Sequence, residues 1–224
     1  MTHLPRRRFL TRLASLSLLA TLPAPLFGQA GRQYRIELVI FEHLGPESRS
    51  FIDGVARPME VNLSGFGIGE GPIRPSRAGF ELARVADRVE SSGQGRVLAR
   101  LAWDQTGRNY HSASWIRIQE GRYLGLRNTS EEPEEISVGG DGLRPLAPQH
   151  ERYELEGRLR VWVGRFLHLE TDLVYHPLDA IRSDPDIPPG VPVRGSQRMN
   201  SGDDLFYLDN PAIGIIARVT RIDG

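Results

Sequence analysis

Apolar and polar positions alternate most regularly along residues 155–175. Two runs with the two-residue period of a half-buried β-strand flank Gly164, and this pattern predicts a β-hairpin. One side of the predicted hairpin is apolar. The other side carries Arg158, Arg160, Trp162, His168, Glu170 and Asp172. The pattern favours a solvated sheet face with a cross-strand ion pair, and a binding surface is the alternative interpretation.

The register of this hairpin can be predicted from its two faces. A two-residue loop would pair apolar positions with polar ones, so a three-residue loop at 163–165 is expected. Each strand then contributes its apolar residues to the same face. The expected pairs are Val161 with Leu167, Leu159 with Leu169, Arg160 with His168, and Arg158 with Glu170.

The same periodicities predict the other elements. Residues 34–41 form a strand that carries apolar residues on both faces toward its end, which is typical of a central strand. The helical pattern is strongest at 78–91, where the apolar face consists of Leu82, Val85, Ala86 and Val89. Further strands are expected at 96–103, 114–119, 193–200 and 213–222. Segment 203–211 is expected to form a turn or a short helix, and 43–75, 123–150 and 176–192 to be mostly irregular.

Strands that follow one another with only one strong helix favour an α+β fold. We expect a single domain over residues 31–224, with a mainly antiparallel β-sheet packed against one main helix. A composition of 39% hydrophobic and 25% charged residues fits a folded, water-soluble chain.

The first thirty residues have the pattern of a signal peptide that is removed after export. Arginines at 6, 7, 8 and 12 precede a short apolar stretch at 13–22, and small residues flank a cleavage position at Ala30. The stretch is too short to span a bilayer comfortably, so no stable membrane insertion is expected after cleavage. The arginines fit either the Sec or the twin-arginine route. Removing them leaves a mildly acidic chain, which does not support nucleic-acid binding.

Two residue types are missing from the sequence. The absence of lysine excludes Schiff-base and P-loop chemistry, and the absence of cysteine excludes disulfides and a lipoprotein anchor. The sequence has no G-x-S-x-G motif, although a Ser-His-Asp site assembled from distant residues stays open.

A metal site would be most plausible at His168, Glu170 and Asp172, which share one face of a strand. The expected neighbours Arg158 and Arg160 are cations and disfavour a divalent ion. A salt-bridged face is therefore favoured, and no cofactor is expected.

Acidic pairs could in principle cleave glycosides, and the candidates are Glu170 with Asp172 and Asp203 with Asp204. Such pairs are common in sequences, so catalysis is not predicted. Binding is easier to support, because arginine holds carboxylates through two parallel hydrogen bonds. Three tryptophans could stack on sugar rings, although each is more often a core residue: Trp103, Trp115 and Trp162.

Seven parts of the sequence form a recognisable set, in order and with matched spacing: 34–42, 97–105, 155–161, 166–173, 197–201, 204–211 and Gly214. Together they resemble the CsiV family of periplasmic peptidoglycan-binding proteins of Gram-negative bacteria. The closing motif departs from the family pattern at Gln197, Asn200, Asp204, Phe206 and Asn210, and the family's two histidines are absent there. Arg198, Met199, Ser201, Tyr207, Asp209 and Pro211 are retained.

The resemblance implies a non-enzymatic periplasmic protein with one CsiV-like domain that binds peptidoglycan and supports cell-envelope and cell-shape integrity. The candidate binding residues are Arg158, Arg160, Trp162, His168, Arg198, Tyr207 and Asp209. Arginines would hold peptide carboxylates, while Trp162 or Tyr207 would stack on a sugar. Two alternatives stay open: an adaptor for another envelope protein, and a wall-cleaving hydrolase that uses acidic residues.

Overall fold

The computed structural model describes residues 31–59, 61, 79–128, 149–179, 188–200 and 204–222. Most of these residues lie in strands that pair antiparallel in two sheets. The elements are β1 (Gln33–His43), α1 (Pro46–Val55), β2 (Arg57–Pro58), α2 (Ala83–Ser91), β3 (Gly95–Thr106), β4 (Ile116–Asn128), β5 (Gln149–Val163), β6 (Leu167–Tyr175), β7 (Pro189–Met199), β8 (Phe206–Asp209) and β9 (Ile213–Ile222). The expected α+β fold with mainly antiparallel strands is confirmed.

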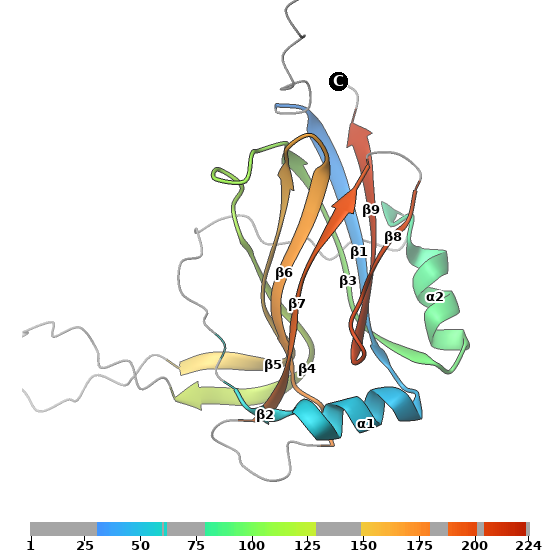
Figure 1. The fold of residues 1–224 in the computed structure, drawn as a ribbon, viewed down its shortest axis with the longest axis vertical. Coiled ribbons are helices and arrows are strands. Elements are labelled where there is room, and N and C mark those ends of the chain that lie inside the picture. Colours follow the sequence, from blue (N-terminus) through green and yellow to red (C-terminus); the bar gives the residue numbers. More distant parts are fainter. Residues whose placement is uncertain are drawn as a thin grey trace, which may run out of the picture.

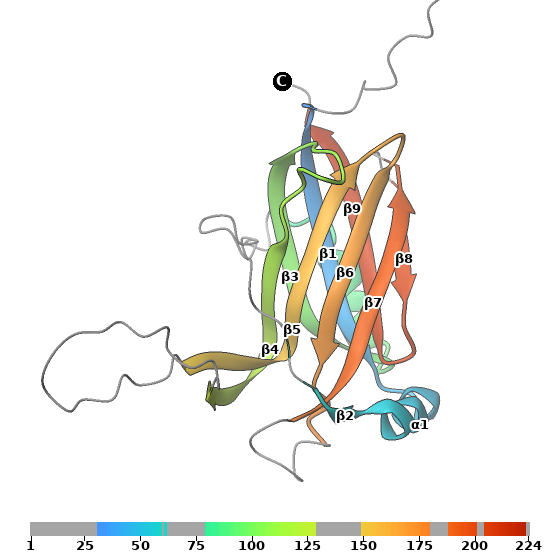
Figure 2. The ribbon, with the colours of Figure 1, turned by 60° about the vertical axis from the view of Figure 1, so that its left-hand side comes forward.

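The strands divide into two sheets that pack face to face (Figures 1 and 2). One sheet has the order β3-β1-β9-β8, and the other has the order β2-β7-β6-β5-β4. The strand predicted at 34–41 lies between β3 and β9, as its two apolar faces indicated. No helix among the described residues is long and apolar enough to cross a membrane.

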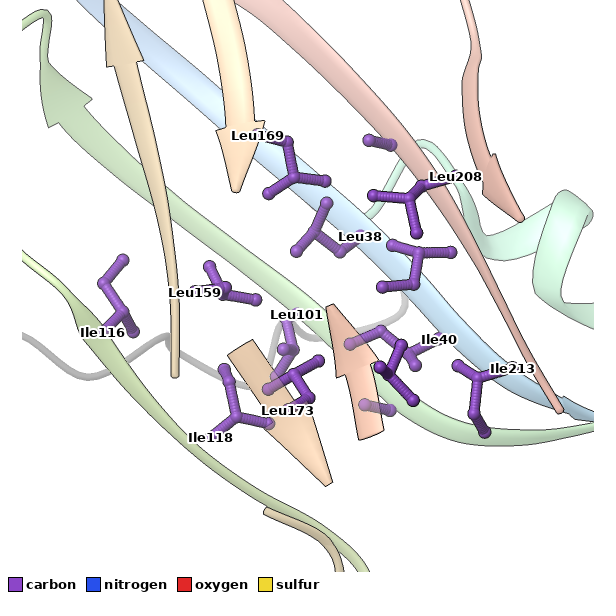
Figure 3. Close-up of a cluster of buried hydrophobic side chains, with 14 of the residues drawn as sticks. Leu38, Ile40, Leu101, Ile116, Ile118, Leu159, Leu169, Leu173, Leu208 and Ile213 are labelled. Carbon is purple, nitrogen blue, oxygen red and sulfur yellow. The ribbon is translucent and has the colours of Figure 1, made fainter. Parts of the chain in front are cut away.

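The main core lies between the two sheets and combines the apolar faces of both. Figure 3 shows Leu38, Leu101 and Ile213 from one sheet beside Leu159, Leu169 and Leu173 from the other. All the residues predicted for the dry side of the 155–175 hairpin are buried. Burial of this apolar surface is the main force that holds the two layers together.

The two helices cover different parts of this sandwich (Figure 1). On the outer side of the four-stranded sheet, Leu82 and Ala86 of the α2 segment pack against Val39, Phe41 and Ala102. Thus the predicted apolar helix face is confirmed. The second helix, α1, crosses one end of the sandwich and buries Ile52. The sequence pattern missed α1 because the helix is short and lies in a segment rich in glycine and proline.

The predicted hairpin register is wrong by two residues. Its three-residue loop is 164–166, so Val163 pairs with Leu167 and Val161 with Leu169. A shift of two residues leaves each side chain on the same face, so the alternation of the sequence cannot distinguish the two registers. The observed register has one clear advantage, because it places arginine opposite acid twice: Arg160 with Glu170, and Arg158 with Asp172.

Segment 203–211 was expected to form a turn or a short helix, but its residues 206–209 form β8. This strand is held by pairing with β9, in which Leu208 lies opposite Ile215. Its four residues carry no sustained period, so tertiary pairing decides their conformation.

Gly157 lies within β5 with φ +130°, a conformation that side chains other than glycine rarely adopt. Its strand neighbours are Ile118 on β4 and Leu173 on β6. A Cβ atom at this position would meet the carbonyl oxygen of Asp172 and would lie 2.8 Å from the Cα atom of Leu173. The absence of a side chain therefore allows the strands to approach closely here.

Some predictions concern residues outside the described ranges. They are the signal peptide at 1–30, Asp203, Ser201 and the interiors of the segments expected to be irregular. These stay predictions.

Candidate functional site

The outer face of the five-stranded sheet is lined by polar and aromatic side chains. No described helix covers this face (Figure 2), whereas α2 covers the outer face of the other sheet (Figure 1). We call it the polar face and define it by the outward residues of β5, β6 and β7. These are Arg158, Arg160, Trp162, His168, Glu170, Asp172, Arg194, Ser196 and Arg198.

Asp172 lies between two arginines on the polar face. Its carboxylate accepts a hydrogen bond of 3.2 Å from Arg158 on β5 and one of 2.8 Å from Arg194 on β7. Burial raises the pKa of Asp172, but the hydrogen bonds and positive charges of Arg194 and Arg158 outweigh it and lower the pKa overall. The carboxyl group is therefore an anion at neutral pH. Arg194 stays 70% exposed and can reach a ligand.

Arg160 is held rigidly from several sides. Its guanidinium donates to Glu170 at 2.9 Å and to the backbone carbonyl of Tyr110 at 3.0 Å. The same group lies over the rings of Tyr110 and Trp115, at 4.1 and 4.4 Å from their centroids. Only 8% of Arg160 is exposed. This arginine therefore fixes the 107–115 loop on the sheet, and we expect it to position the site more than to bind a ligand directly.

At the hairpin end of the polar face, two rings lie flat against each other. The centroids of Trp162 and His168 are 3.8 Å apart, with an angle of 4° between the planes. Burial and the nearby charge of Arg198 lower the pKa of His168, so the imidazole is neutral at neutral pH. Arg198 itself lies over the ring of Phe166 at 4.1 Å.

A shallow hollow of about 370 Å³ lies in the middle of the polar face. Its lining residues come from four strands or their ends, and they include Trp115, Arg158, Asp172, Arg194 and Ser196. Guanidinium, carboxylate, hydroxyl and indole groups thus meet in one place. These groups can hold carboxylates, amides and sugar hydroxyls.

The predicted site residues divide into two groups. Arg158, Arg160, Trp162 and His168 lie together on the polar face, as the alternation indicated, and Arg198, named from the family resemblance, joins them through the pairing of β7 with β6. The other two candidates, Tyr207 and Asp209, belong to β8 of the four-stranded sheet.

There they form a cluster with His43, which the sequence analysis did not identify. The hydroxyl of Tyr207 donates to Asp209 at 2.8 Å and lies 3.2 Å from His43 Nε2. Burial and the hydrogen bond to Asp209 raise the pKa of Tyr207, so the phenol stays protonated.

Sequence reasoning also missed Arg194, Ser196 and Tyr110 on or beside the polar face. It named Trp115 as a residue that could stack on a sugar ring, but it did not place Trp115 beside Arg158. Alternation along 193–200 could have placed Arg194, Ser196 and Arg198 on one side of a strand. It could not have shown that this strand pairs with β6. Tyr110 lies in a loop, where no periodicity indicates which way a side chain points, and Trp115 directly precedes β4.

The carboxylates of the polar face are engaged by arginines. Glu170 is bound by Arg160, and Asp172 by Arg158 and Arg194. Within the described ranges, no group of three or more histidine, aspartate or glutamate residues is placed to hold a metal ion. Glycoside hydrolysis needs one carboxylic acid with a raised pKa, and the lowered pKa of Asp172 is the opposite of that requirement.

A second charged network, which is partly buried, lies near α1. Arg96 donates to Glu42 at 2.8 Å and to Glu154 at 3.1 Å, and Glu154 is fully buried. The hydroxyl of Tyr175 donates to Glu42 at 2.5 Å. Burial, followed by this hydrogen bond and the charge of Glu42, raises the pKa of Tyr175. The network joins β1, β3, β5 and β6, and it links the two sheets at one end of the sandwich.

Comparison with known proteins identifies the family. The sequence model described as "Peptidoglycan-binding protein, CsiV" matches residues 47–222, which is most of the chain. No curated protein and no solved structure matches the chain. The matched range contains the whole polar face, all of α2, and α1 except its first residue, Pro46. The chain therefore belongs to the CsiV family of peptidoglycan-binding proteins.

Proposed function

We propose that the protein binds peptidoglycan in the periplasm through its polar face, without cleaving it, and thereby supports the integrity of the cell envelope and cell shape. The observation that carries the proposal is the sheet face that no described helix covers, with its hollow between Arg158, Asp172 and Arg194. Family membership supports the same ligand, and the predicted signal peptide supports the compartment.

The chemistry of the face suits a polymer of acetylated sugars and short peptides. Arg194 offers exposed N–H groups to a peptide carboxylate, because it contacts Asp172 through Nε and a guanidinium carries further N–H donors on its two terminal nitrogens. Ser196 adds a hydroxyl beside it. A flat face spread over several strands also fits an extended ligand better than a deep pocket would.

A role as an adaptor for another envelope protein is the main alternative for the same surface. The polar face is rich in charges and poor in exposed apolar side chains, which favours a polar polymer over a protein partner of the hydrophobic type. Binding to purified sacculi, which contain no protein partner, distinguishes the two roles.

The first test removes the two arginines that flank Asp172. The double variant Arg158→Gln and Arg194→Gln is expected to pull down with purified sacculi at least about tenfold less than the wild type, because two charge-assisted contacts are lost. Binding should also weaken as salt is raised, since Arg194 is solvent-exposed. Co-sedimentation at two salt concentrations measures both effects.

The matched control is Arg100→Gln. Arg100 is also an exposed arginine paired with an acid, at 2.8 Å from Glu90, but it lies on the sheet that α2 covers. Its replacement should leave sacculus binding unchanged. Equal binding by the double variant and the wild type would show that the polar face is not the binding surface.

The absence of cleavage can be tested directly. Sacculi incubated with the wild-type protein are expected to release no more soluble muropeptides than sacculi incubated with buffer, because Glu170 and Asp172 are both paired with arginines. Chromatography of the supernatant measures this release. Release that disappears in Glu170→Gln would instead establish a hydrolase.

A further inference from the structure

Several chain segments meet at the end of the sandwich that holds the β5–β6 loop (Figure 2). In the four-stranded sheet, the start of β1 pairs with the ends of β3 and β9. In the five-stranded sheet, the start of β6 pairs with the ends of β5 and β7. A hydrogen bond of 2.7 Å from the N–H of Val163 to the carbonyl oxygen of Arg108 joins the two sheets here. The segments at this end are therefore 31–34, 106–112, 163–168, 197–200 and 219–222.

These described segments contain arginines and no acidic residue. Their five arginines are all exposed: Arg32, Arg108, Arg165, Arg198 and Arg221. Asp104, which precedes this end on β3, is paired with Arg35 at 2.8 Å. Residues 31–224 as a whole carry a surplus of acids, so the positive charge is concentrated in one place. We call this part of the molecule the basic end.

The positive charges of the basic end are not neutralised by a carboxylate. Arg108, Arg165 and Arg198 form no ion pair and no side-chain hydrogen bond with any residue that the structure describes. Instead, Arg165 and Arg198 lie over the ring of Phe166, at 5.5 and 4.1 Å from its centroid. An aromatic ring holds a guanidinium group in place without cancelling its charge. These arginines therefore remain able to bind an anionic surface.

Apolar side chains lie among the arginines of the basic end. Tyr110 is 46% exposed and Ile222 is 38% exposed, while Phe166 is half-buried. At a membrane surface, aromatic rings lie at the level of the lipid headgroups and arginines approach the phosphates. An exposed aliphatic group beside several cations suits such an amphiphilic surface better than it suits a sugar polymer.

The basic end is also where the predicted signal peptide joins the fold. The N–H of Gly31 donates to the carbonyl oxygen of Gly107 at 3.0 Å, beside Arg108. Residues 23–30 separate Gly31 from the apolar stretch at 13–22, and a segment of that length spans at most about 30 Å. While the predicted signal peptide is held in the membrane, the basic end must therefore lie close to the lipid surface.

We propose that the basic end docks reversibly on a membrane surface that contains anionic phospholipids. The arginines pair with lipid phosphates, and Tyr110, Phe166 and Ile222 enter the headgroup layer without insertion of any strand into the bilayer. The inference goes beyond the proposed wall binding. Asp172, in the hollow of the polar face, lies about 17 Å along β6 from the start of that strand, so a membrane at the basic end leaves the hollow open.

The first test measures binding to vesicles of two compositions. Protein purified from the periplasm after export is mixed with vesicles of equimolar phosphatidylethanolamine and phosphatidylglycerol, or of phosphatidylcholine alone, and the vesicles are floated. The anionic vesicles are expected to bind at least about tenfold more tightly than the neutral ones, and raised salt should release the protein. Absence of binding to the anionic vesicles, or equal binding to both, would overturn the proposal.

Variants locate the effect at the basic end. Arg108→Gln combined with Arg165→Gln should weaken binding to the anionic vesicles about 25-fold, because each arginine near such a surface contributes about fivefold. The matched control is Arg49→Gln combined with Arg57→Gln, which removes the same charge from exposed positions on α1 and β2 at the other end of the sandwich. The control should bind like the wild type. An equal loss in both double variants would mean that only net charge matters, which would contradict the proposal.

A charge-conserving pair separates charge from folding. Arg108→Lys combined with Arg165→Lys should retain vesicle binding, and its failure to do so would contradict the proposal. Neither Arg108 nor Arg165 belongs to the polar face, so the glutamine pair should still bind sacculi like the wild type. Loss of sacculus binding with unchanged vesicle binding would assign the basic end to the wall and overturn this inference. Vesicle binding thus tests the inference alone, and sacculus binding by the wild type tests the proposed function.

Discussion

Replacing Gly157 with alanine is expected to lower the free energy of unfolding by about 3 kcal/mol or more. Two costs combine in this variant. The backbone has φ +130°, which is strained for any residue with a side chain. The new Cβ atom would also collide with the backbone of Asp172 and Leu173 on β6, where neither strand can move without breaking its ladder. Urea unfolding followed by circular dichroism measures the difference.

Gly54→Ala is the matched control for this substitution. Gly54 lies in α1 without a positive φ, and a Cβ atom there would meet no other atom within 4 Å. Alanine should therefore stabilise the protein slightly or leave it unchanged, by up to about 1 kcal/mol. If Gly157→Ala proved as stable as Gly54→Ala, the conclusion that β5 and β6 lie too close at Gly157 for a side chain would be wrong.

Replacing Arg96 with leucine should destabilise the protein by about 3–5 kcal/mol. The reason is the partner that is left behind, because Glu154 is fully buried and would lose the charge that compensates it. Glu42 would lose the same cation, at 2.6 Å. Chemical unfolding of the variant gives the measurement.

A double variant and a surface pair serve as controls. Arg96→Leu combined with Glu154→Leu removes both charges, so it should be more stable than Arg96→Leu alone. Arg100→Leu breaks an exposed pair with Glu90 and should cost no more than about 1 kcal/mol. A cost for Arg96→Leu as small as that for Arg100→Leu would mean that water reaches Glu154.

The sequence predicted which side of each strand faces the core better than it predicted strand pairing. In the 155–175 hairpin, Val161 and Leu167 are both buried, as their alternation required. Their predicted pairing is nevertheless wrong, because Val161 lies opposite Leu169. A period of two specifies the face of a residue and leaves its partner undetermined whenever the register shifts by two.

For the candidate site, too, the sequence predicted which residues share a face but not which strands lie next to each other. Alternation within one hairpin brought together Arg158, Arg160, Trp162 and His168 on one face. It could not reveal Arg194, because that residue reaches Asp172 through the pairing of β6 with β7 across a long connection. Alternation also could not show which sheet each strand joins. Because β8 belongs to the four-stranded sheet, Tyr207 and Asp209 lie on the other layer of the sandwich.

The two outer faces of the sandwich differ, because α2 covers the outer face of the four-stranded sheet and no described helix covers the polar face. If the polar face lies against the cell wall, α2 points away from the wall. Arg84 of α2 is exposed, and the chain contains no cysteine. A single cysteine introduced at position 84 can therefore carry a dye on the side away from the polar face, without touching the surface that we propose binds the wall.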